Sequence, residues 1–302
     1  MNDRFGRPVK GLRVSITERC NLDCFYCHRE GCPQTRGEMK AAEIGEIVKL
    51  AAGFGVEKLK ITGGEPLVRS DVVDVISAVS VHGIKEVSMT TNGALLAERA
   101  RELAEAGLNR VNISLDTLDP EKFREITGSR ALGDVLAGVD AAADAGLSPV
   151  KLNMVMLAGV NDDEFRMMLD YASGKGAIVQ FIELVDGREN TAKYHMKLDQ
   201  IEAELDKMAV STQTRWEMQA RKKYTLPSGG AEIVCPMHNS EFCSHCTRLR
   251  LTPDGRLKPC LLRNDNLVDV ISPIRAGDMQ LARQRFLDAI SKREPYFRAN
   301  PT

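Results

Sequence analysis

The eight cysteines of this 302-residue chain are confined to two short segments. Four lie from Cys20 to Cys32 and four from Cys235 to Cys260, and the 202 residues between these segments contain none. Structural disulfides do not need such clustering, whereas metal coordination does. The distribution therefore predicts two separate metal sites, and cysteine is too sparse for a small secreted disulfide scaffold.

Charge and hydropathy exclude two classes of protein. Lys and Arg number 41 against 42 Asp and Glu, and without a basic excess we expect no nucleic-acid partner. The longest run without a charged residue is eleven residues, Val87 to Ala97, well short of the roughly 20 apolar residues that cross a bilayer. No membrane contact is expected, and the N-terminus shows no apolar signal-peptide core. We therefore expect a cytoplasmic protein whose thiols stay reduced.

Short β-rich runs alternate with amphipathic segments over the first 185 residues. Strands are predicted at Leu12 to Thr17, Lys58 to Thr62, Glu86 to Thr91, Arg110 to Asp116, Val150 to Leu157 and Ile178 to Val185. Helical patterns fill the gaps, and one of them begins at Asp119-Pro120, an N-cap followed by proline. Six β-then-α units predict an α/β fold, an incomplete (βα)6 TIM-like barrel with a parallel sheet.

The alternation stops after Val185, and we place a domain boundary near residue 190. Residues 1–190 would form the barrel, and residues 191–302 a C-terminal region that binds a second cluster and the substrate. Within the C-terminal region, the pattern predicts a helix over 196–209, irregular or strand-like structure over 211–234, a hairpin over 248–262 turned by Pro253-Asp254-Gly255, and a last helix over 274–292.

The first metal site is predicted in the loop that follows the first strand. Cys20-X3-Cys24-X2-Cys27 presents three thiolates within eight residues, and three cysteines on a four-iron cluster would leave one iron open for chemistry. The alternative is a zinc knuckle closed by Cys32 or His28. Spacing alone leaves both interpretations open, and the Gly-Gly-Glu-Pro segment after the second strand weakens the zinc interpretation.

The segment from Ile16 to Cys27 resembles the signature of radical S-adenosylmethionine enzymes. The segment Thr62-Gly-Gly-Glu-Pro-Leu67 resembles their second motif, which binds the methionine end of the cofactor. The resemblance implies that Cys20, Cys24 and Cys27 hold a 4Fe-4S cluster whose fourth iron S-adenosylmethionine chelates. It also implies cofactor contacts from Tyr26, Gly64 and Ser114.

The second metal site is predicted from Cys243-X2-Cys246-X13-Cys260, whose third cysteine lies across the hairpin. A zinc site completed by Cys235, His238 or His245 is, on spacing alone, an equal alternative. The alternation of a strand places Arg248 and Arg250 on one face, and arginine forks match phosphate oxygens.

The segment from Phe242 to Leu261 resembles the C-terminal signature of the GTP 3′,8-cyclases of molybdenum cofactor biosynthesis, and this likeness extends over nearly the whole chain. It implies a lyase in which Cys243, Cys246 and Cys260 hold a second 4Fe-4S cluster that binds the purine of GTP. The 5′-deoxyadenosyl radical would remove the ribose 3′ hydrogen, C3′ would attack C8, and reduction and protonation would give 3′,8-cyclo-7,8-dihydro-GTP. The implied GTP-binding residues are Arg13, Lys60, Thr91, Lys151, Arg248, Leu249 and Arg250. The family also implies an electron donor, a downstream cyclic pyranopterin monophosphate synthase and a homodimer.

Three residues and the C-terminus depart from the bacterial pattern. Lys60 and Gln180 stand where bacterial members carry arginine, and Val185 replaces a methionine. The chain ends without the double-glycine tail of those relatives, and Cys32 and Cys235 have no assigned role. Two alternatives stay open: a radical S-adenosylmethionine enzyme that modifies a peptide or another substrate, and a zinc-stabilised binding module without catalysis.

Overall fold

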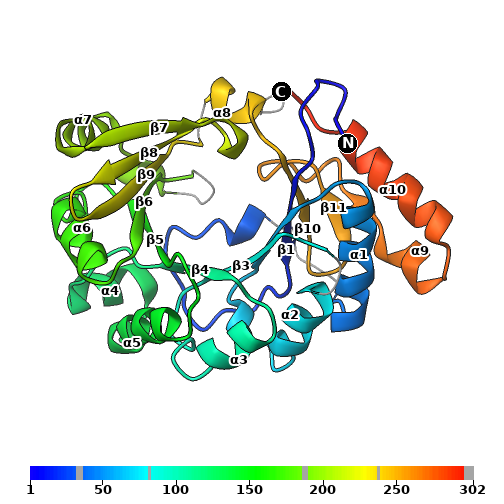
Figure 1. Cartoon of the computed structure of the whole chain (residues 1–302), viewed down its shortest axis with the longest axis horizontal. Coiled ribbons are helices and arrows are strands. Elements are labelled where there is room, and N and C mark those ends of the chain that lie inside the picture. Colours follow the sequence, from blue (N-terminus) through cyan, green and yellow to red (C-terminus); the bar gives the residue numbers. More distant parts are fainter. Residues whose placement is uncertain (32–36, 81–82, 186–189, 237–238, 296–302) are drawn as a thin grey trace.

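A single twelve-stranded sheet curves around the centre of the molecule in the computed structural model, which describes residues 1–31, 37–80, 83–185, 190–236 and 239–295 (Figure 1). The strands lie in the order β12-β11-β10-β1-β2-β3-β4-β5-β6-β9-β8-β7. The six predicted barrel strands are all present: β1 (Gly11–Ser15), β2 (Lys58–Thr62), β3 (Glu86–Thr91), β4 (Arg110–Ser114), β5 (Lys151–Met156) and β6 (Ile178–Glu183). All pair in parallel, so the incomplete α/β barrel is confirmed.

Strands from the C-terminal third extend both edges of this sheet. The remaining strands are β7 (Ser211–Arg215), β8 (Arg221–Leu226), β9 (Gly229–Val234), β10 (Arg248–Leu251), β11 (Arg256–Lys258) and β12 (Val268–Asp269). β9 pairs in parallel with β6, and β10 pairs in parallel with β1. Residues far beyond the predicted boundary at 190 therefore belong to the barrel wall, and the division into two domains stays a prediction.

Most of the helices cover the outer face of the sheet (Figure 1). The helices of the described residues are α1 (Ala41–Gly53), α2 (Val72–Ser80), α3 (Ala100–Glu105), α4 (Pro120–Thr127), α5 (Leu132–Asp144), α6 (Phe165–Gly174), α7 (Asp199–Met208), α8 (Ser240–Ser244), α9 (Ile271–Arg275) and α10 (Met279–Ser291), with short 3-10 turns η1 (Arg29–Gly31), η2 (Pro66–Val68), η3 (Ala192–Tyr194) and η4 (Trp216–Met218). Two of these elements, α8 and η1, instead carry residues that line the cavity on the inner side. The Asp119 carboxylate caps α4 as predicted, because it accepts from two backbone amides of the first turn. No helix in the described ranges has both the length and the apolar character needed to cross a bilayer.

The structure alters one predicted helix and confirms the hairpin. β10 and β11 pair antiparallel around Pro253-Asp254-Gly255 as expected. The single helix predicted over 274–292 is wrong: Gly277, with φ +74°, separates α9 from α10. A glycine in the left-handed region ends a helix readily because it has no Cβ.

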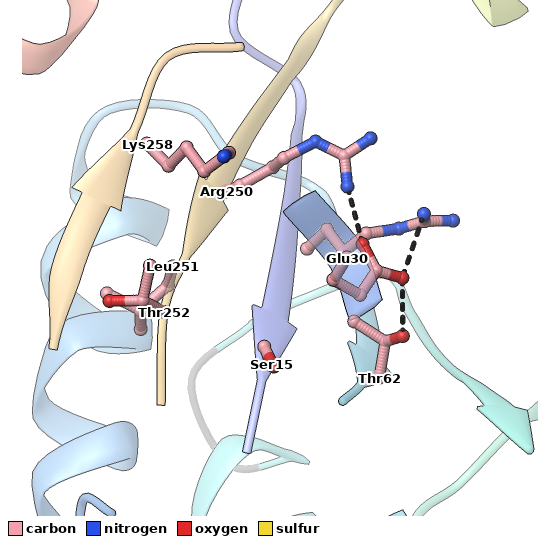
Figure 2. A pocket seen from close by; sticks show the side chains of 8 residues that line it. Ser15, Glu30, Thr62, Arg250, Leu251, Thr252 and Lys258 are labelled. Carbon is pink, nitrogen blue, oxygen red and sulfur yellow. Dashed lines mark hydrogen bonds and ion pairs between the residues drawn. The ribbon is translucent and has the colours of Figure 1, made fainter. Parts of the chain in front are cut away.

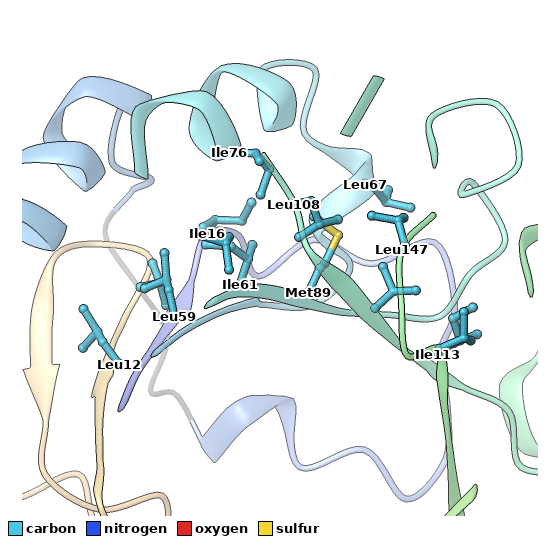
Figure 3. Close-up of a cluster of buried hydrophobic side chains, with 14 of the residues drawn as sticks. Leu12, Ile16, Leu59, Ile61, Leu67, Ile76, Met89, Leu108, Ile113 and Leu147 are labelled. Atoms are coloured by element: carbon cyan, nitrogen blue, oxygen red, sulfur yellow. The ribbon is translucent and has the colours of Figure 1, made fainter. Parts of the chain in front are cut away.

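The first two barrel strands, β1 and β2, have an apolar outer face and a polar inner face. Leu12 on β1 and Leu59 and Ile61 on β2 are fully buried and pack toward the helices (Figure 3). The residues between them, Arg13 and Lys60, pair in register on the opposite face. Because side chains alternate along a strand, the same pattern that builds the hydrophobic core directs cationic groups into the barrel.

Helix α5 supplies a matched pair of glycines for testing the packing of this outer layer. A Cβ on Gly138 would lie 2.4 Å from the Gly93 carbonyl oxygen, whereas one on Gly133 would meet nothing within 4 Å. We predict that Gly138→Ala lowers the free energy of unfolding by about 1–3 kcal/mol through overpacking. Gly133→Ala should leave stability unchanged or raise it by up to about 1 kcal/mol. Urea unfolding measures both, and equal stabilities would contradict the packing described.

Candidate functional site

Both groups of cysteines face one cavity inside the barrel. The first cysteine trio, Cys20, Cys24 and Cys27, lies on the loop after β1, at the carboxyl edge of the parallel sheet. The second cysteine trio comprises Cys243 and Cys246, in and just after α8, and Cys260, just after β11. All six line a cavity of about 360 Å³ and none is in a disulfide. The fold thus joins two motifs that are more than 200 residues apart.

The Gly-Gly-Glu-Pro segment supports the backbone of the first trio's loop. The amide of Gly64 donates to the Thr17 carbonyl at 2.8 Å, and the amide of Glu65 donates to the Arg19 carbonyl at 2.8 Å. A Cβ on Gly64 would lie 2.2 Å from the same Arg19 oxygen. Only glycine therefore allows the two loops to approach this closely.

The carboxylate of Glu65 ties the same loops to β3. It accepts from the Thr91 hydroxyl at 2.7 Å and from the amides of Asn92 at 2.6 Å and Leu67 at 3.0 Å. Burial raises the pKa of Glu65 to about 7, although these hydrogen bonds oppose the shift. The carboxyl group is thus a buried structural link between both sequence motifs and the third strand.

The first trio carries hydrogen-bond donors suited to thiolate sulfur. The amides of Leu22 and Arg29 point at the sulfurs of Cys20 and Cys27, each at 3.4 Å. Burial raises the pKa of Cys24 strongly, and the nearby Asp116 charge adds to this effect. Thiolates in such surroundings need a cationic partner, so the donor set fits a bound metal cluster. Among the described residues, no three His, Cys, Asp or Glu side chains converge as they would around a single ion.

A buried ionic network holds the second trio in place. Asp3 pairs with Arg7 at 2.9 Å and with Arg293 at 3.0 Å. Arg7 donates to the Cys243 carbonyl at 2.9 Å, and Arg293 donates to the Cys246 carbonyl. Burial alone would raise the pKa of the Cys246 thiol, but Arg293 and Arg248 outweigh it and lower the pKa. The two trios therefore have opposite electrostatic surroundings, acidic around the first and cationic around the second.

The residues expected to contact S-adenosylmethionine lie together beside the first trio. Tyr26, Gly64 and Ser114 all line the cavity. The Tyr26 hydroxyl donates to Asp116 Oδ2 at 2.5 Å, and Asp116 Oδ1 accepts from the Val155 amide at 2.9 Å. Burial raises the pKa of Asp116 to about 6. Asp116, which the sequence motif did not single out, orients the tyrosine.

The residues expected to contact GTP fall into two groups. Arg13, Arg248 and Arg250 line the cavity. The other four do not line it. Lys60 Nζ donates to Asn112 Oδ1 at 2.8 Å, and Lys151 pairs with buried Glu232. The Thr91 hydroxyl donates to Glu65, and the side chain of Leu249 is fully buried on the opposite face of β10. The expected alternation of Arg248 and Arg250 on one face is present, and Arg250 pairs in register with Arg13.

Glu30 bridges the two inward arginines on neighbouring strands (Figure 2). Its carboxylate pairs with Arg250 at 2.8 Å and with Arg13 at 3.3 Å, and accepts from the Thr62 hydroxyl at 2.8 Å. Burial would raise the pKa of Glu30, but the charges of Arg13 and Arg250 lower it to about 2. Sequence reasoning missed this residue because its partners come from β1, β2 and β10.

The remaining residues singled out from sequence have separate places. Cys32 and His238 lie outside the described residues. Cys235 packs against the hydrophobic core, and burial raises the pKa of its thiol to about 12. Gln180 accepts from Asn112 at 2.8 Å and donates to Glu232, and Val185 lines the cavity.

Substitution of Glu30 tests the charge balance of the inner face. We predict that Glu30→Gln lowers the free energy of unfolding by about 3 kcal/mol at pH 7, because two buried guanidiniums lose their counter-charge. The pKa of Glu30 is lower in the folded chain, about 2, than its ordinary 4.5. Its stabilisation is therefore complete above the ordinary value and is lost as the pH falls toward 2. The difference in free energy of unfolding between wild type and Glu30→Gln should therefore be smaller at pH 3.5 than at pH 7, by about 1 kcal/mol.

Urea unfolding of the cluster-free chain at both pH values measures this gap. Glu57→Gln is the control, because Glu57 pairs with Lys10 and Lys85 at the exposed surface and should change little. A Glu30→Gln variant as stable as wild type at pH 7 would contradict the bridging role.

Substitution of Gly64 tests the contact between the two motifs. We predict that Gly64→Ala displaces the loop of the first trio and costs about 1–3 kcal/mol of stability. The reconstituted variant should also hold less iron per chain than wild type. Gly53→Ala, at the end of α1 with open space around it, is the matched control. Unchanged stability and iron content in Gly64→Ala would show that the loops tolerate a side chain there.

Two families match consecutive parts of the chain: the Radical SAM superfamily over residues 14–172 and Molybdenum Cofactor Synthesis C over residues 177–299. A "Probable GTP 3′,8-cyclase" from Methanothermobacter thermautotrophicus is 48% identical over 98% of this chain and 99% of its own length. The protein of the same name from Methanocaldococcus jannaschii is 46% identical over 99% of both chains.

Solved structures of similar fold include Streptococcus suis SuiB, with a TM-score of 0.67 and 17% identity over 88% of this chain. The chain spans 64% of the length of SuiB. Native anSMEcpe with bound AdoMet has a TM-score of 0.62 and 16% identity, and the match covers 94% of this chain and 81% of anSMEcpe. At these identities the likeness concerns the fold alone.

Proposed function

Because the chain belongs to the GTP 3′,8-cyclase family of radical S-adenosylmethionine enzymes, we propose that it converts GTP into 3′,8-cyclo-7,8-dihydro-GTP. This reaction is the first step of molybdenum cofactor biosynthesis. The observation that supports the proposal most directly is the single cavity lined by both cysteine trios and by inward arginines. A nucleotide held there would have its phosphates near cations and its reacting carbons near both metal sites.

The first trio would hold a 4Fe-4S cluster, and Tyr26, Gly64 and Ser114 would bind S-adenosylmethionine beside it. When bound and reduced, this pair supplies the 5′-deoxyadenosyl radical that removes the 3′ hydrogen of the GTP ribose. The chain's own contribution is positional. The Gly64 and Glu65 amides hold the cysteine loop, and Asp116 holds Tyr26.

The second trio would hold a second 4Fe-4S cluster at which the purine of GTP binds. Arg13, Arg248 and Arg250 would contact the triphosphate, because guanidinium forks make charge-assisted hydrogen bonds to phosphate oxygens. We propose that the four expected residues that do not line the cavity act at the edge of this site, through partner side chains or the backbone; they are Lys60, Thr91, Lys151 and Leu249. The walls of the barrel would hold the ribose beside the S-adenosylmethionine site, so that the reacting groups need not meet by diffusion. The same walls would exclude water from the reaction.

The proposal extends to the surroundings of the enzyme. We propose two domains divided near residue 190, a cytoplasmic location, an external electron donor, a homodimer, and delivery of the product to a cyclic pyranopterin monophosphate synthase. The peptide-modifying and zinc-module alternatives are not favoured, because relatives named GTP 3′,8-cyclase match the whole chain at 46–48% identity.

The test is anaerobic incubation of the reconstituted, reduced protein with S-adenosylmethionine and GTP. We predict formation of 5′-deoxyadenosine and 3′,8-cyclo-7,8-dihydro-GTP together, and about eight irons per chain for two four-iron clusters. Cys24→Ala should abolish formation of both products. Cys243→Ala should retain cofactor cleavage and lose GTP conversion.

Cys235→Ala is the matched control, because Cys235 packs against the core and is not among the residues that line the cavity. This variant should keep both products and the full iron content. Cofactor cleavage by wild type without consumption of GTP would indicate a different substrate. Fewer than about four irons per chain would contradict even a single four-iron cluster.

A further inference from the structure

The arginines that line the cavity differ in whether they form an ion pair with a carboxylate. Arg7 and Arg293 share Asp3, Arg13 and Arg250 share Glu30, and Arg263 pairs with Asp265. Arg221 and Arg248 also line the cavity, and within the described residues neither forms an ion pair. Two guanidiniums therefore face the cavity without an ion-paired carboxylate in the part of the chain that the structure describes.

Arg221 is held in a position where its charge is unfavourable without a ligand. The Nε of Arg221 is buried and has no hydrogen-bond partner among the described residues. Within these residues, the guanidinium makes one side-chain hydrogen bond, in which Nη2 donates to Gln219 Oε1 at 3.3 Å. Burial lowers the pKa of Arg221 to about 10, and the charge of Arg13 acts in the same direction against the attraction of Glu232. An anion in the cavity would relieve both the desolvation and the repulsion.

The two residues before Arg221 have a strained backbone conformation. Gln219 and Ala220, directly before β8, have φ values of +69° and +54°, a region that residues with a side chain rarely adopt. Such strain persists where the surrounding structure requires it and is concentrated at ligand sites. Here it turns Gln219 and Arg221 into the cavity at the start of the strand.

Contacts also place Arg221 next to the second cysteine trio. Its guanidinium carbon lies 6.0 Å from the centre of the Phe242 ring, and Phe242 directly precedes Cys243. The backbone amide of Phe242 is in turn fixed by the Asn239 side chain at 2.9 Å. The stacked ring orients the guanidinium without neutralising it.

We propose that Arg221, together with Arg248, binds the phosphate groups of the substrate. This inference rests on the proposed function and adds to it a residue of the C-terminal region that the sequence motifs do not contain. Arg13 and Arg250 share the one negative charge of Glu30 and so keep one positive charge between them, whereas Arg221 and Arg248 each add a full positive charge that attracts the anion. Gln180, which stands where bacterial members carry arginine, donates to Glu232, and the charge of Glu232 also acts on Arg221.

The experiment compares binding of GTP, GMP and guanosine to the reconstituted holoenzyme by anaerobic calorimetry. Arg221→Gln should weaken GTP about 10- to 100-fold, the loss of one charge-assisted contact, and change guanosine less than about twofold. Arg221→Lys keeps the charge and loses the fork, so it should weaken GTP by an intermediate factor. Lys222→Gln is the control, because Lys222 lies on the same strand and pairs with Glu202 at the surface.

The outcomes separate this inference from the proposed function. If wild type binds GTP more tightly than guanosine, and Arg221→Gln and Arg221→Lys show the same preference, the role of Arg221 is overturned and the proposed function is not. An equal loss for GTP and guanosine in both variants would also overturn it, since the effect would then be structural. Wild type that binds GTP no better than guanosine would overturn both proposals. If Arg221→Gln fails to fold, the GTP-to-guanosine ratio of Arg221→Lys decides the question.

Discussion

The parallel pairing of β10 with β1 is the interaction on which the site depends. It places Gly11 opposite Arg248 and Arg13 opposite Arg250, and so brings a strand from the end of the chain beside the first strand of the barrel. The hairpin that follows β10 carries Cys260, and the short helix before it carries Cys243. Without this pairing the second cysteine trio would have no fixed relation to the first, and the cavity would lose one wall.

Charge balance inside the barrel follows from the same pairing. Inward side chains from adjacent strands lie close together, so the cations of β1, β2 and β10 repel one another across a poorly solvated space. Glu30 offsets part of this repulsion because Arg13 and Arg250 share it. Glu232 is likewise shared by Lys151 of β5 and Arg215 of β7. The positive charge that is not offset would attract an anionic substrate. It also lowers the stability of the protein when no substrate is bound.

Much of the fold was predictable because its signals are local. The six barrel strands and the Asp119 cap arise from periodicity and from one side chain bonding to its own helix. The split between α9 and α10 was missed although the sequence carries its signal: Gly277 ends one helix, and the Asp278 side chain caps the next by accepting from the Leu281 amide. Other residues were missed for another reason: Glu30, Asp116 and Arg221 act through contacts with other loops, helices or strands, and no motif spacing records such contacts.

The sequence by itself determined the two cysteine motifs, the alternation that sends arginines inward, and the class of fold. These depend on short-range spacing, which the chain carries in one dimension. Only the tertiary structure decided that both cysteine trios share one cavity, that Arg13 and Arg250 share the carboxylate of Glu30, and that no carboxylate among the described residues pairs with Arg221 or Arg248. Which charges meet is set by strand order and register, and those become defined only when the sheet assembles.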